Sequence, residues 1–197
     1  LLISKTGLLY NSTYAKTLQG GENSWFNTNL LHTFYFLIPF TVMTIVFSKP
    51  ALFALNPIYE SAVPILIILS LVMFVRTIGG AFLVFLMGSE KVDTNDDSST
   101  KDYLSSKLIH LPTIKLIQNT FYLVMLAVGL LILMNFGISE IDLLIYWALL
   151  TLVFDIIYSS YLFSKIKEIL SIKLKFFSIL KYTFLSIVIF VSFSQLT

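Results

Sequence analysis

Two charged residues lie deep inside apolar stretches of the sequence and are the first candidates for chemistry. Arg76 is the only arginine in the protein, and Asp155 interrupts another long apolar run. A charge at the centre of a bilayer costs at least ~2.5 kcal/mol on insertion scales, so each side chain is expected to face protein or water. A guanidinium suits an anionic substrate such as a pyrophosphate. An embedded carboxylate suits a coupling proton or cation, which makes Asp155 the ion-coupling candidate.

The depths of these two charges predict that they share one polar site. Arg76 follows the start of its segment by about 14 residues and Asp155 by about 12, and both segments are predicted to cross the membrane in the same direction, from outside to inside. At 1.5 Å per residue their Cα levels differ by about 3 Å. The pair is either a structural ion pair in a dry core or a binding site in a wet cavity, and both alternatives stay open.

A second polar group consists of Lys115, Gln118 and Asn119. Their spacing of i, i+3 and i+4 places them on one face of a helix. They either line the mouth of a cavity or are a snorkelling lysine beside two amides that bond to neighbouring helices. Together with Arg76 they are the candidate substrate-binding residues.

The composition excludes most other chemistry. Hydrophobic residues make up 57% of the 197 residues and charged residues 12%, and the mean hydropathy is +0.87. There is no cysteine, and His32 and His110 are far apart, so we expect no disulfide, no catalytic residue, no metal site and no cofactor. A net charge of +2 is too small to indicate nucleic acid.

The apolar residues form long blocks without alternation, which favours helices over a membrane β-barrel. A hydrocarbon core of about 30 Å needs about 20 helical residues. The predicted fold is an all-α, polytopic transmembrane helix bundle with about five spanning helices over residues 30–197. The five segments that qualify are 30–48, 61–87, 108–135, 141–163 and 176–195. Because the chain begins Leu1-Leu2 and its first 29 residues mix polar and apolar types, we expect it to be part of a longer protein.

The loop lysines predict the orientation. One side carries Lys5, Lys16, Lys91, Lys101, Lys107, Lys165, Lys167, Lys173 and Lys175, and the other side carries only Lys49. Lysine excess marks the cytoplasmic side, so the N-terminal segment and loops 88–107 and 164–175 are predicted to be cytoplasmic in a multi-pass protein of the cell membrane. Aromatic residues near the predicted helix ends are interpreted as interfacial anchors: Trp25, Tyr59, Tyr103, Tyr146, Trp147, Tyr158 and Tyr161.

An ordered series of motifs then resembles a known family. A helix containing a proline ends in a short apolar motif, a tyrosine–x–x–alanine signature opens the next helix, glycine and lysine close it, and the following helix carries an asparagine. The residues concerned are Pro39, 47–52, Tyr59, Ala62, Gly88, Lys91 and Asn119. The series resembles the polysaccharide-biosynthesis flippases of the multidrug/oligosaccharidyl-lipid/polysaccharide exporter superfamily. It covers most of residues 1–135, and the glycine–alanine signature that usually opens the family's twelfth helix is absent around residues 141–150.

The resemblance implies a C-terminal lobe whose partner is a missing N-terminal lobe of the same protein. The five spans would be helices nine to thirteen, and residues 1–29 would be the cytoplasmic end of a preceding helix plus a loop. Such lobes alternate access around a cavity that takes the sugar-pyrophosphate headgroup of a lipid-linked oligosaccharide while the lipid tail stays in the bilayer. No covalent chemistry is needed, so the chain is not expected to be an enzyme.

Three other functions remain open. A small-molecule exporter of the same superfamily would use Asp155 for cation exchange. A non-transporting scaffold subunit would need only packed helices. A membrane glycosyltransferase would need clustered carboxylates at the membrane face, and the only candidates lie in residues 93–102.

Overall fold

The computed structural model describes residues 24–88, 106–169 and 176–195. Its elements are α2 (Ser24–Val46), α3 (Ser48–Leu55), the 3-10 helix η1 (Pro57–Ala62), α4 (Val63–Gly88), α6 (Lys107–Asn135), α7 (Glu140–Ile169) and α8 (Phe176–Ser194). No strand occurs within these ranges. Five helices are long and apolar enough to cross a membrane, which confirms the prediction of an all-α polytopic bundle. The candidate carboxylates of residues 93–102, and most of the segments predicted to be cytoplasmic, lie outside the described residues.

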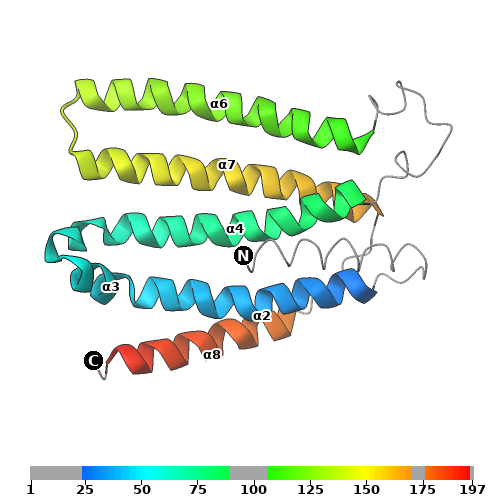
Figure 1. Ribbon diagram of the computed structural model, residues 1–197, viewed down its shortest axis with the longest axis horizontal. Helices are drawn as coiled ribbons and strands as arrows, with labels where there is room; N and C mark the ends of the chain where they lie inside the picture. Colours follow the sequence, from blue (N-terminus) through cyan, green and yellow to red (C-terminus); the bar gives the residue numbers. More distant parts are fainter. Residues whose placement is uncertain (1–23, 89–105, 170–175, 196–197) are drawn as a thin grey trace.

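The long helices lie side by side in the order α6, α7, α4, α2 and α8 (Figure 1). Successive spans run in opposite directions, so α2, α6 and α8 begin at the end of the row where α4 and α7 finish (Figure 1). The most extensive contact joins α4 to α7, and α7 separates α4 from much of α6. The helices α6, α7 and α4 therefore form one side of the row.

Local sequence explains the turns at the other end of the row. The Asn56 side chain accepts a hydrogen bond from the Ile58 amide at 3.0 Å and caps η1, which Pro57 begins. The ion pair of Lys49 with Glu60, 2.8 Å long, joins α3 to η1, and the hydrogen bond to Glu60 and its charge raise the pKa of Lys49. Gly137, with φ of 67°, turns the chain after α6.

Two helices extend beyond their predicted limits. α2 begins at Ser24 rather than at residue 30, and α7 continues to Ile169 rather than ending at residue 163. In α7 the extension has a clear cause, because Ile166 is fully buried and Lys165 pairs with Glu168 at 2.9 Å along the outer face. Hydropathy alone ends the span where lysines begin, whereas side-chain packing continues the helix.

The main apolar core lies at the end of the row where α2 and α6 begin and α4 and α7 finish. Phe26 stacks on Phe85 with ring centroids 4.4 Å apart. In lipid, side-chain packing rather than exclusion from water holds helices together, so this close-packed end sets their spacing. The cluster consists of Phe26, Leu30, Phe82, Phe85, Leu86, Leu111, Tyr158, Leu162 and Ile166.

Candidate functional site

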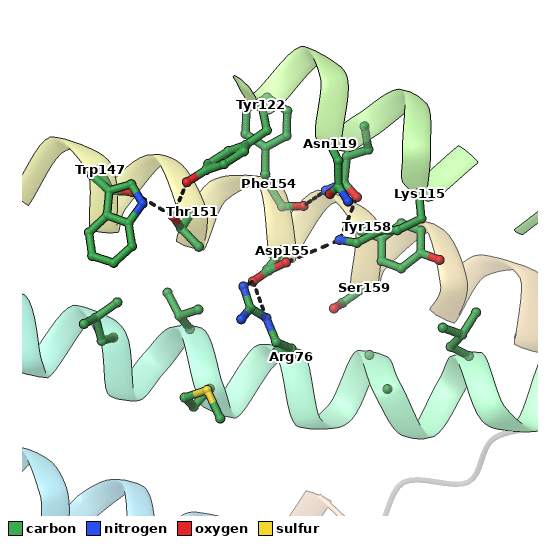
Figure 2. A pocket seen from close by; sticks show the side chains of 17 residues that line it. Arg76, Lys115, Asn119, Tyr122, Trp147, Thr151, Phe154, Asp155, Tyr158 and Ser159 are labelled. Carbon is green, nitrogen blue, oxygen red and sulfur yellow. Dashed lines mark hydrogen bonds and ion pairs between the residues drawn. The ribbon is translucent and has the colours of Figure 1, made fainter. Parts of the chain in front are cut away.

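A cavity of about 630 Å³ lies between α4, α6 and α7, with side chains of all three helices around it (Figure 2). Each charged side chain in its lining comes from a different helix. The lining residues are Leu69, Val72, Met73, Arg76, Gly79, Gly80, Leu83, Lys115, Gln118, Asn119, Tyr122, Trp147, Thr151, Phe154, Asp155, Tyr158 and Ser159.

The first pair in this cavity joins Arg76 of α4 to Asp155 of α7. The Nη2 and Nε groups of Arg76 both donate to Oδ2 of Asp155, at 2.8 and 3.1 Å. The Asp155 side chain is only 9% exposed, whereas that of Arg76 is 56% exposed. The carboxylate is therefore buried in the wall, and the guanidinium stays accessible from the cavity.

Lys115 of α6 approaches the same carboxylate from the opposite side (Figure 2). Its Nζ lies 3.6 Å from Oδ1 of Asp155, donates to Oε1 of Gln118 at 2.9 Å, and lies 4.3 Å from the ring centroid of Tyr158. Gln118 in turn donates through Nε2 to the carbonyl of Phe154. The lysine is thus held by a carboxylate, an amide and an aromatic face rather than snorkelling to the surface.

The charges of this group do not balance. Among the residues that line the cavity, Asp155 is the only acid, and it faces the two cations Arg76 and Lys115. The two cations share one carboxylate, so the group carries a net positive charge in a region where the low dielectric makes charge unfavourable. A cavity with this excess favours an anionic occupant.

A close approach of two helices brings Arg76 and Asp155 together. Ser159 of α7 donates its hydroxyl to the Val75 carbonyl of α4 at 3.3 Å. A Cβ on Gly79 would lie 3.3 Å from the Ser159 Cβ and would collide with the Ser159 hydroxyl. A glycine at this position lets α4 and α7 touch along their backbones one turn from the ion pair.

All five residues selected from the sequence line this one cavity. Arg76 and Asp155 are in contact, as their depths predict, and Lys115, Gln118 and Asn119 reach the same space from α6. The arrangement combines features of the two alternatives for the pair, a structural ion pair and a binding site, because the charges touch directly yet border a cavity. Their role in binding stays a prediction.

Trp147 and Tyr158, two of the aromatic residues interpreted as interfacial anchors, have a place in the structure that the sequence did not indicate. Both line the cavity, and Tyr158 is 8% exposed beneath Lys115. Sequence reasoning also missed Thr151. A signal existed, because Trp147 and Thr151 precede Asp155 at helical spacings of four residues and Tyr158 follows it by three, which places all four on one face of α7.

Known proteins add no assignment to this geometry. No family model, curated protein or solved structure matches the chain. Within the described residues no group of three or more histidine, cysteine or acidic side chains is placed to hold a metal ion. The function must therefore be inferred from the cavity itself and from the motif series of the sequence.

Proposed function

We propose that the chain is the C-terminal lobe of a flippase that moves lipid-linked oligosaccharides or polysaccharide precursors across the membrane. The observation that carries the proposal is the uncompensated positive charge of the cavity, where Arg76 and Lys115 share the single carboxylate of Asp155. The pyrophosphate that joins such a lipid to its sugar would supply the missing negative charge.

The geometry of Arg76 suits this role. Its Nε and Nη2 groups are engaged by Asp155, and its Nη1 group has no hydrogen-bond partner within the described part of the chain. A phosphate oxygen can accept from Nη1 while Asp155 holds the guanidinium plane in place. Lys115 adds a point charge from α6. The lipid tail would stay in the bilayer, and a second lobe would close the pathway on its other side.

Two other functions are supported less well. A cation-coupled exporter needs a carboxylate that can receive the cation, but Oδ2 of Asp155 is held by Arg76 and Oδ1 faces Lys115. A scaffold subunit does not need an unbalanced charge at this depth, because burying the charge lowers stability and contributes nothing to helix packing. An anion site accounts for both features.

The proposal is tested by binding of farnesyl pyrophosphate to the full chain in lipid nanodiscs. We expect Arg76→Ala to weaken binding by about 10-fold or more, the usual effect of a lost charge-assisted hydrogen bond. Arg76→Lys should restore part of the affinity, because it returns the charge but not the planar donor. Lys181→Ala is the matched control, since Lys181 is a cation on α8 outside the cavity.

Unchanged binding by Arg76→Ala, in a variant that is expressed and folded like the parent chain, would exclude an anion-binding role for the cavity. Transport is then measured with the protein that includes the second lobe, reconstituted in vesicles. Arg76→Ala should slow the transfer of a lipid-linked oligosaccharide between leaflets. Normal flux would count against the flippase even if the cavity binds pyrophosphate.

A further inference from the structure

The cavity has two chemically different ends. Arg76, Lys115 and Asp155 form the charged end, and Tyr122 and Trp147 lie at the other end (Figure 2). Along α7, Trp147 precedes Asp155 by about two helical turns, a rise of about 12 Å. No charged side chain lines the cavity at the Trp147 end among the described residues. A ligand that fills both ends needs an anionic part and an uncharged part.

The hydrogen bonds at the uncharged end leave specific groups available. The Thr151 hydroxyl donates to the Trp147 carbonyl at 2.8 Å, so its only proton is used. In the 3.1 Å contact between the Tyr122 and Thr151 hydroxyls, Tyr122 is therefore the donor, and its phenolic oxygen keeps its acceptor capacity. The ring of Tyr122 is fixed edge-on against Phe154, with centroids 5.6 Å apart.

Two further polar groups border the cavity without partners among the described residues. They are the indole N–H of Trp147, which can only donate and lies at the uncharged end, and the side-chain amide of Asn119, which can donate and accept and lies beside Lys115 (Figure 2). The uncharged end thus presents an acceptor, the Tyr122 hydroxyl oxygen, and a donor, the Trp147 indole N–H, around an aromatic surface. Hydroxyl groups satisfy such a set, because each both donates and accepts.

We propose that this end of the cavity is a sugar subsite, in which the Trp147 indole stacks on one face of a hexose ring. Tyr122 bonds to a ring hydroxyl. The assignment rests on the proposed function and adds the position of each part of the ligand along the cavity. The pyrophosphate lies at mid-span between Arg76 and Lys115, and the first sugar lies toward the end of α7 that carries Glu140. The distance between the two ends is of the order of a pyrophosphate joined to one hexose.

The test compares two probes on the full chain in nanodiscs. One is farnesyl pyrophosphate, and the other carries N-acetylglucosamine on its terminal phosphate. We expect Trp147→Ala to lower the affinity for the glycosylated probe about 5- to 10-fold, as for loss of one aromatic stack. The affinity for farnesyl pyrophosphate should stay within about twofold of that of the parent chain. Trp147→Phe keeps an aromatic ring and should retain part of the affinity for the glycosylated probe. Tyr122→Phe, which removes only the phenolic oxygen, should lower the affinity for the glycosylated probe alone.

Fluorescence gives an independent measurement. The protein has two tryptophans, so in a Trp25→Phe background Trp147 is the only one. Its emission should change with the glycosylated probe and much less with farnesyl pyrophosphate. Equal effects of Trp147→Ala on both probes, or on neither, together with normal dependence on Arg76, would overturn the sugar subsite and leave the anion site standing. Failure of the parent chain to bind either probe would overturn both.

Discussion

Removal of the Asp155 carboxylate is the sharpest perturbation of the charged group. Asp155→Asn keeps the shape of the side chain but leaves Arg76 and Lys115 facing each other without a counter-ion. Breaking a fully buried pair costs about 3–5 kcal/mol, and breaking an exposed one costs about 0–1 kcal/mol. Asp155 is 9% exposed and Arg76 is 56% exposed, so the loss should lie between these limits. We expect about 2 kcal/mol, or roughly 30-fold in the unfolding equilibrium.

Lys115→Met provides the matched comparison, because it deletes the excess charge and keeps an unbranched side chain only one atom shorter. The remaining pair of Arg76 with Asp155 is neutral, so we expect the free energy of unfolding to stay within about 0.5 kcal/mol of the parent chain or to rise. Both variants are measured by denaturant unfolding in the same detergent micelles. A stability loss for Lys115→Met as large as that for Asp155→Asn would refute the idea that the cavity carries a net positive charge.

Two further predictions concern helix packing and orientation. Gly79→Ala should destabilise the protein by about 1 kcal/mol, because its methyl group meets Ser159. The double variant Gly79→Ala with Ser159→Ala should recover part of this loss. Additive losses of the two single variants in this double-mutant cycle would contradict the contact. The protein has no cysteine, so single cysteines report topology directly. A cysteine at Ser139, in the turn between α6 and α7, should react with a membrane-impermeant reagent added to intact cells, whereas cysteines at Ser98 and Ser171 should not, and the opposite pattern would reverse the predicted orientation.

The sequence predicts the spans and the depth of the charges because both follow from counting residues along the chain. Segment length and composition locate the five helices, and similar residue counts from the predicted helix ends bring Arg76 and Asp155 to nearly the same level. The partner of Lys115 could not be predicted in this way. Its contact with Asp155 depends on α6 lying next to α7 in the row, and hydropathy does not specify which helices are neighbours.

The position of Tyr158 could not be predicted for a related reason. Tyr158 lies near the end of a predicted span, where amphipathic rings commonly meet the membrane surface. The structure continues α7 to Ile169, so Tyr158 lies well inside the helix and packs against the apolar core. The position of the helix end thus decides where along the helix the residue is expected to lie.

Stability and binding make opposite demands on the charged group. Replacing Lys115 by an apolar residue should leave the empty protein at least as stable, because the excess charge then disappears. The same replacement removes half of the cationic pair that would attract a phosphate. An anion that binds the folded protein adds stability by mass action, and its gain is larger where it also neutralises an unpaired cation. Thermal stabilisation by farnesyl pyrophosphate should therefore be marked in the parent chain and small in Lys115→Met, because in the variant there is no excess charge left for the ligand to neutralise.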